Sequence, residues 1–126
     1  METTKEFVTR KNKEFGTKNK IIWMKDIGRK GRHGFKREAW VFLPASNLRD
    51  HKVFVFERLR HIERSGKFAY NNLRTLEYLE YRIGYYMRGQ IRNAKSRWIW
   101  GQFCPMIPVK DLDRLLKMAK QKRVIV

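Results

Sequence analysis

Hydrophobic and polar positions follow two different periods along this chain, and the changes of period predict its elements. An apolar run over Ile21 to Met24 precedes a stretch with three glycines, residues 28–34, and residues 35–43 then alternate with a period of two. Glycine allows the positive φ values that a tight turn requires, and a period of two is typical of a strand. The pattern predicts a β-hairpin with a basic tip, whose second strand ends at Pro44 and keeps Phe35, Arg37, Ala39, Val41 and Leu43 on one face.

Beyond Pro44 the apolar spacing becomes helical. Ser46 or Asn47 is a suitable cap, and Gly66 is a suitable end. Between them the apolar residues follow at spacings of 7, 4 and 3, in the order Leu48, Val55, Leu59 and Ile62. The pattern predicts a helix. The cluster from Val53 to Phe56 is β-branched and aromatic, so taken alone it also fits a strand.

A second, shorter helix is predicted after a cap at Asn71 or Asn72, with Leu73, Leu76 and Leu79 on its apolar side. From Tyr81 the period returns to two: Ile83, Tyr85 and Met87 share one strand face, and Arg97 to Phe103 alternate again after a basic loop. The chain closes with an amphipathic helix that starts at Pro108 and carries the apolar stripe Leu112, Leu115, Leu116 and Ala119.

The predicted order is hairpin, helix, helix, hairpin, helix. The central part matches a helix-turn-helix followed by a β-hairpin wing, so we expect a small α+β protein with one winged-helix-like domain over residues 21–126. Residues 1–20 contain few large apolar side chains, only Phe7, Val8 and Phe15. We expect this segment to be a flexible basic arm or, at best, a weak helix.

Composition narrows the class of partner. The 126 residues include 30 Lys and Arg against 12 Asp and Glu, a formal net charge of +18, and 42% of the residues are hydrophobic. That content is too high for a disordered chain, and the charge favours an anionic partner. Because no apolar run is long enough to cross a bilayer, a soluble intracellular protein is expected. The single cysteine, Cys104, excludes an internal disulfide and is expected to be a small buried hydrophobe.

The sequence predicts a nucleic-acid-binding protein whose favoured partner is double-stranded DNA. A transcriptional regulator is one protein of this kind. Guanidinium and ammonium groups on two hairpin loops can reach phosphates, and amide and guanidinium groups on the second predicted helix can contact base edges in a major groove. The candidate residues are Arg29, Lys30 and Arg32 in the first loop, Asn72 and Arg74 on the helix, and Arg88, Arg92, Lys95 and Arg97 around the wing.

Two other functions stay open. One is a protein that coats or packages nucleic acid without distinguishing sequences, or that binds single-stranded DNA or RNA by stacking bases on aromatic side chains. Trp98 and Trp100 are the candidates for such stacking, but positions in the core explain them more readily. The other is a nuclease with an unrecognised site. Glu57 and His61, one turn apart on the predicted helix, have the spacing of an acid and base pair, but an ordinary exposed contact between side chains four residues apart explains them more readily. No cofactor or metal is expected. The apolar stripe of the last helix, with Val109 and Met118 beside it, suggests a homodimer.

Overall fold

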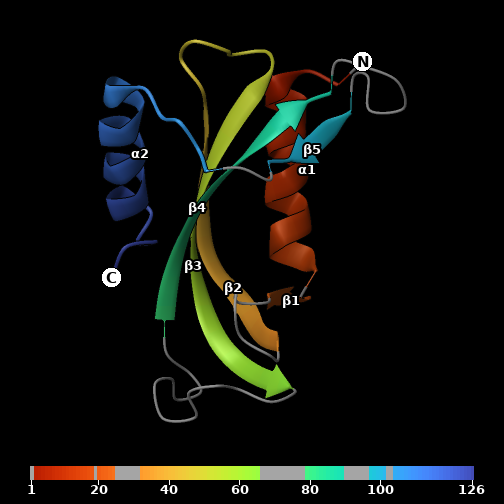
Figure 1. Ribbon diagram of the computed structural model, residues 1–126. Coiled ribbons are helices and arrows are strands. Elements are labelled where there is room, and N and C mark those ends of the chain that lie inside the picture. Colours follow the sequence, from red (N-terminus) through yellow and green to blue (C-terminus); the bar gives the residue numbers. More distant parts are fainter. Residues whose placement is uncertain (1, 19, 25–31, 66–78, 90–96, 102–103) are drawn as a thin grey trace.

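The computed structural model describes residues 2–18, 20–24, 32–65, 79–89, 97–101 and 104–126 as one α+β unit. Helix α1 (Thr4–Thr17) is followed by strands β1 (Ile21–Met24), β2 (Arg32–Pro44), β3 (Lys52–Ser65), β4 (Leu79–Arg88) and β5 (Trp98–Trp100), and helix α2 (Val109–Gln121) ends the chain. The strands form one antiparallel sheet in the order β1-β2-β3-β4-β5. The sheet is curled, and α1 and α2 cover its opposite faces (Figure 1).

Both predicted hairpins are present. β1 pairs with β2 from Ile21 opposite Lys36 to Met24 opposite His33, and β2 ends at Pro44 as expected. β4 pairs with β5 through Tyr86 to Arg88 opposite Trp98 to Trp100, which makes β5 shorter than the predicted strand. The tips of both hairpins, residues 25–31 and 90–96, lie outside the described residues.

The helix predicted after Ser46 is wrong, because these residues form a turn and then strand β3. Val53 and Val55 face α1, whereas Phe54 and Phe56 face α2, and all four are buried. A strand with both faces covered carries a continuous apolar run instead of an alternating one, and such a run resembles a helical pattern. The strand, which the Val53 to Phe56 cluster left open as an alternative to the helix, is therefore the correct assignment.

The second predicted helix falls largely on residues 66–78, outside the described part of the chain. Its last two residues, Leu79 and Glu80, belong to β4 instead. With β3 in place of the first predicted helix, the described residues contain no helix-turn-helix, and the helices they do form are α1 and α2 at the two ends of the chain.

Residues 4–17 form a helix, which is the second of the two expected alternatives for this segment. Thr3 and Glu6 make a capping box, in which the Thr3 hydroxyl accepts from the Glu6 amide and the Glu6 carboxylate accepts from the Thr3 amide. Phe7 is fully buried, and its ring lies 4.5 Å from that of Trp98 and 5.1 Å from that of Tyr86. Phe15 packs beside it, with its ring centre 5.5 Å from that of Trp40 and 5.4 Å from that of Phe42. One fully buried aromatic anchor, a second half-buried ring and a cap thus hold a helix that has little apolar surface of its own.

A β-bulge in β2 breaks the alternation predicted for residues 35–43. The register shifts between Arg37 and Ala39, so Glu38 is the extra residue. Arg37 lies on the α1 face, where it contacts Glu57 and Phe15, but Ala39, Val41 and Leu43 pack on the α2 side. The predicted common face of all five residues is therefore wrong at its first two positions.

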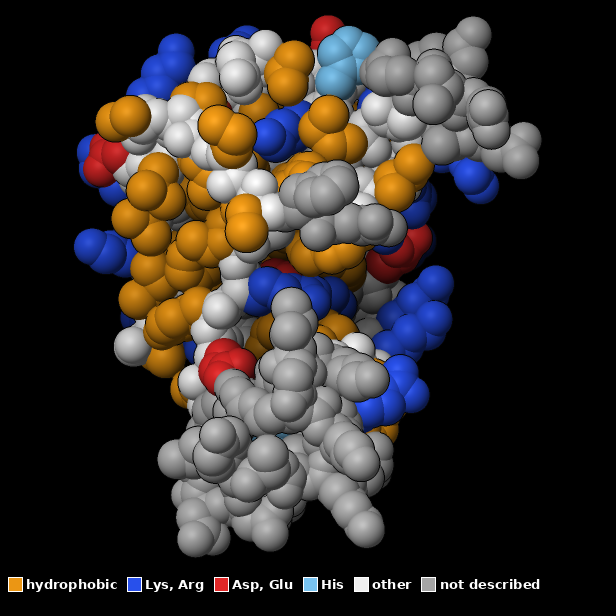
Figure 2. All heavy atoms as spheres, viewed as in Figure 1, with side chains coloured by type: hydrophobic (Ala, Val, Ile, Leu, Met, Phe, Trp, Pro, Cys, Tyr) orange, Lys and Arg blue, Asp and Glu red, His pale blue; other side chains and the backbone are white. Residues whose placement is uncertain are grey.

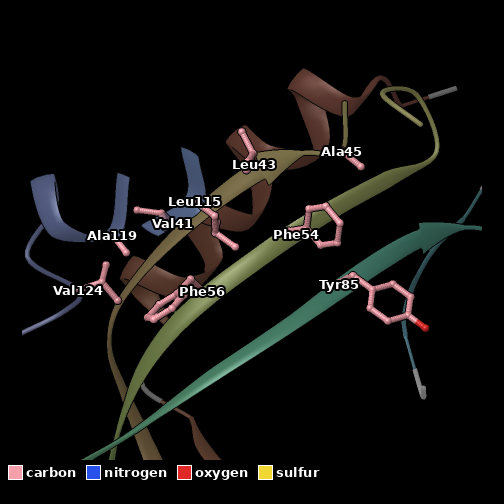
Figure 3. Packing of buried hydrophobic residues seen from close by; sticks show 9 residues of the cluster. All are labelled: Val41, Leu43, Ala45, Phe54, Phe56, Tyr85, Leu115, Ala119 and Val124. Atoms are coloured by element: carbon pink, nitrogen blue, oxygen red, sulfur yellow. The ribbon is translucent and has the colours of Figure 1, made fainter. Parts of the chain in front are cut away.

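Helix α2 begins where it was predicted, with Pro108 as its N-cap, and buries Leu115 and Ala119. These residues meet Val41, Leu43, Phe54, Phe56 and Tyr85 in the cluster of Figure 3. Asp111 is also buried, and its carboxylate accepts from the backbone amide of Ser46 at 2.8 Å. This contact ties α2 to the turn between β2 and β3. No helix among the described residues is long and apolar enough to cross a membrane.

We predict that Phe7→Ala lowers the free energy of unfolding by about 3 to 5 kcal/mol, the usual cost of deleting a buried aromatic ring. Urea unfolding followed by tryptophan fluorescence measures this change, because Trp98 lies against the deleted ring. Val8→Ala, at a half-buried neighbouring position, is the control and has a smaller cost. An unchanged unfolding midpoint for Phe7→Ala would show that α1 does not depend on this anchor.

Tyr86 makes stability fall in alkaline solution. Burial, and secondarily the negative charge of Glu57, raises the pKa of the Tyr86 phenol to about 12 from the ordinary 10.0. The unfolded chain therefore loses this proton first, and the contribution of Tyr86 to stability is full below pH 10 and is lost between about pH 10 and 12. Tyr86→Phe removes that part of the alkaline loss. The urea midpoints of the parent and of Tyr86→Phe across this pH range measure the loss of stability, and phenolate absorbance reports the ionisation of tyrosine. Parallel pH profiles of the two proteins would contradict the assignment of this loss to Tyr86.

Candidate functional site

Three of the sequence-predicted site residues lie in the described part of the chain, namely Arg32, Arg88 and Arg97. Arg32 and Arg97 are exposed, and Arg32 lies 6.0 Å from the centre of the Trp23 ring. The remaining candidates apart from Arg88 lie outside the described residues, and their phosphate or base contacts stay predictions: Arg29, Lys30, Asn72, Arg74, Arg92 and Lys95.

Arg88 is buried inside the fold, contrary to the prediction that it contacts phosphates from the surface of the wing. Only 7% of the residue is exposed. Its guanidinium donates to the backbone carbonyls of Asp50 at 3.0 Å and Glu2 at 2.6 Å, and stacks over the Trp98 ring at 4.5 Å. Arg88 therefore joins the start of the chain and the β2–β3 turn to β4. A charged residue followed by a basic loop looks the same in sequence whether it faces solvent or the interior.

We predict that Arg88→Ala costs about 2 to 3 kcal/mol of folding stability, because two backbone carbonyls lose a charged donor. Arg97→Ala is the matched control, since Arg97 is exposed at the other end of the same loop. Its unfolding midpoint should equal that of the parent. Thermal unfolding by circular dichroism distinguishes the two variants, and equal midpoints for both would place Arg88 on the surface.

Acidic side chains are largely used inside the fold. Glu57 is completely buried, and its two carboxylate oxygens accept from Arg37 Nε and Arg82 Nε, each at 2.7 Å. The Arg37 guanidinium also lies 3.5 Å above the Phe15 ring, and that of Arg82 lies 4.8 Å from the Trp100 ring. A buried carboxylate needs such complete pairing, because desolvating an uncompensated charge is costly.

Glu57 and His61 do not form the acid and base pair considered for a nuclease. They are separated along a strand instead of one helical turn, and each has another partner. His61 Nε2 lies 3.0 Å from His33 Nδ1, and both histidines are buried. Cys104, expected to be buried, is exposed. It follows β5 in a stretch without regular structure, so no packed face encloses it.

Glu38 neutralises two further arginines on the opposite face of the sheet. The bulge directs its carboxylate to Arg60 and Arg58. The hydrogen bond from Arg60 is the largest cause that keeps the pKa of the Glu38 carboxyl below its ordinary value, with Arg58 adding to the effect. Glu38 therefore stays ionised in neutral solution and holds two cations within the structure.

The basic surplus that remains is exposed. Among the residues whose exposure the structure describes, the exposed acidic side chains are Glu6, Asp50 and Asp113, whereas the exposed basic ones are Lys5, Arg10, Lys13, Lys18, Lys20, Arg32, Lys36, Arg49, Arg97, Lys110, Arg114, Lys117, Lys120, Lys122 and Arg123. On the face shown in Figure 2, Lys and Arg side chains project along both flanks, and hydrophobic side chains gather beside α2.

The most regular basic group lies on the outward side of α2. Lys110, Lys117 and Lys120 are all exposed and are 7 and 3 residues apart, which places them on one side of the helix over about 15 Å. We call these three residues the α2 stripe. Lys117 makes an exposed ion pair with Asp113, an interaction of little energetic weight. Their common face was not among the sequence predictions, although their spacing opposite Leu115 and Ala119 already specifies it.

Aromatic side chains that could stack on unpaired bases are mostly engaged within the protein. Trp98 and Trp100 are partly buried and pack on the α1 side of the sheet, as expected for core residues. Gly84 makes room for Trp100, since a Cβ there would lie 2.1 Å from the indole ring. Of the other described aromatics, Trp23 and Tyr81 are exposed, but they lie on strands that are not neighbours.

Comparison of the chain with protein-family models, curated proteins and solved structures found no match.

Proposed function

We propose that the protein binds nucleic acid through the phosphate backbone, with double-stranded DNA as the preferred partner and without recognition of base sequence. The observation that carries the proposal is the α2 stripe, a rigid line of exposed lysines on a protein whose net charge is +18. Because Glu38 and Glu57 are committed to arginines inside the fold, they do not offset this field at the surface.

The spacing of the stripe suits a duplex. Each strand of DNA presents one phosphate per roughly 3.4 Å of helix axis, so about 15 Å of helix faces several phosphates of one strand. Ammonium groups bind phosphates as mobile point charges and confer affinity without base preference. The internal packing of Trp98 and Trp100 removes the most evident stacking platform for single strands.

Recognition of a particular sequence has less support than it had from the sequence alone, because β3 replaces the first helix of the predicted helix-turn-helix. Base contacts by Asn72 and Arg74, which lie outside the described residues, stay a prediction. So does the homodimer: Val109 and Met106 are highly exposed near the start of α2, which is where an apolar contact between copies would form.

The test is the salt dependence of binding to a random-sequence duplex. Each phosphate contact contributes about 0.9 to the magnitude of the slope of log K against log salt. Replacing the α2 stripe by alanine (Lys110→Ala, Lys117→Ala, Lys120→Ala) should therefore lower that magnitude by about 2.7. Fluorescence anisotropy at several salt concentrations measures the slope, and alanine preserves the helix.

A matched control removes the same number of charges at the far end of α1, with Lys13→Ala, Lys18→Ala and Lys20→Ala. This variant should keep nearly the parent slope. If both variants lower the slope equally, the attraction comes from diffuse net charge and α2 is not the interface. If the parent protein does not bind duplex DNA in low salt, the proposed function is wrong.

A further inference from the structure

Strand β2 has an open edge along most of its length. On the side away from β3 it pairs with β1 only from His33 to Lys36. From Arg37 to Pro44 no strand among the described residues covers that side. An uncovered edge presents a row of backbone donors and acceptors to solvent, which is a template for pairing with another extended chain.

The hydrogen-bond pattern shows which groups face this edge. The Ala45 amide donates to the Lys52 carbonyl at 3.0 Å, and in an antiparallel pair every second residue bonds to the neighbouring strand. The register then turns the backbone groups of Ala39, Val41 and Leu43 toward β3. Those of Trp40 and Phe42 point outward along the open edge.

A groove runs along the same edge between the two helices. It consists of two hollows of about 510 and 520 Å³ that share Val8 of α1 in their walls. Residues 38–44 of β2 form its floor, Thr9 and Asn12 stand on the α1 side, and Arg114 and Met118 stand on the α2 side. We call it the edge groove. Its floor is apolar where Val41, Phe42 and Leu43 lie, and its ends are set by the Glu38 bulge and by Pro44.

The walls of the edge groove are basic. Lys5, Arg49, Arg114 and Lys122 line it from three different elements and are all exposed. Its acidic members are Asp50 and Glu38, and the Glu38 carboxylate is bound by Arg58 and Arg60. A chain that enters the groove therefore meets backbone groups at its floor and positive charge on both sides.

We propose that the edge groove binds an extended acidic segment of another protein, which adds to β2 as a further strand. Main-chain hydrogen bonds to Trp40 and Phe42 supply register, and acidic side chains meet the basic walls. A second copy of this chain is the less suitable occupant, because each copy carries a net charge of +18 and would bring its own basic walls to the contact. This inference stands independently of nucleic-acid binding.

The first test uses a short capped peptide of alternating Glu and Val as the probe. It should bind the intact protein, measured by calorimetry, and a Lys and Val peptide of the same length should not. A third peptide keeps the Glu and Val sequence but has N-methyl groups on alternate backbone nitrogens along one edge. It retains the charge and loses the donors, so it should bind at least about tenfold more weakly. Equal binding of the methylated peptide, or no binding of the first, would overturn the proposal.

The second test determines which basic residues the acidic peptide contacts. Arg114→Glu with Lys122→Glu reverses two charges on the groove side of α2, whereas Lys110→Glu with Lys117→Glu reverses two charges on the α2 stripe. Peptide binding should weaken about tenfold or more in the first variant and little in the second. The proposed duplex binding should respond in the opposite order. The two proposals can thus fail separately, and equal peptide affinity in both variants would place the peptide elsewhere.

Amide hydrogen exchange measured by NMR reports strand addition directly. In the free protein, the amides of Val41 and Leu43 should be protected and those of Trp40 and Phe42 should exchange faster. Saturating probe peptide should slow exchange at Trp40 and Phe42. Protection of these two amides without peptide, together with a dimeric mass by light scattering, would assign the edge to a second copy and overturn the acidic partner. Unchanged exchange with bound peptide would exclude an added strand.

Discussion

The burial of β3 on both of its faces is the constraint on which the rest of the structure depends. Val53 and Val55 require cover on one side, and Phe54 and Phe56 require it on the other. A sheet with two apolar faces is stable only between two layers, and the chain supplies them from its ends as α1 and α2. This explains why a weakly apolar N-terminal segment is helical: Phe7 fills a site among Phe42, Tyr86 and Trp98 that would otherwise be open to water.

The positions of the paired charges follow from the same arrangement of one helix on each face of the sheet. The α1 face extends beyond the apolar cluster to Glu57, which is buried and needs both Arg37 and Arg82. The bulge at Glu38 makes this compatible with the other face, since it leaves Arg37 near Glu57 and turns Glu38 toward Arg58 and Arg60. Two carboxylates thereby hold four arginines within the fold. Apart from the buried Arg88 and the half-buried Lys11 and Lys52, the other basic side chains whose exposure the structure describes lie at the surface.

Helix α2 serves two surfaces with different chemistry. Its outward side carries the evenly spaced lysines of the α2 stripe, which suit a phosphate backbone. Its groove side carries Arg114, Met118 and Lys122 at successive spacings of four, beside the open edge of β2. Because the helix is anchored by Leu115, Ala119 and the Asp111 contact, both surfaces are held rigidly relative to the sheet. Rigid presentation lowers the entropy cost of binding on either side.

Sequence alone determined the features that depend on local periodicity and on counting. The two hairpins, the C-terminal helix from Pro108, the α+β class and the charge surplus follow from alternation, turn residues and composition, and each was predicted correctly. The capping box at Thr3 and Glu6 and the one-sided lysines of α2 are also local signals of the sequence, which the spacing of the residues already contains.

Only the tertiary structure decided the features that depend on what covers a residue. The run from Val53 to Phe56 is a strand enclosed by two helices. Its β-branched and aromatic composition fits a strand, but the helical spacing of the apolar residues around it indicated a helix, and only the burial of both faces decides between them. Arg88 is buried because the β2–β3 turn and the start of the chain offer carbonyls at its position. Within the described part of the chain, the edge of β2 is open beyond Lys36 because β1 pairs with β2 only as far as that residue. Burial, pairing and exposure are relations between distant segments, and a one-dimensional pattern does not contain them.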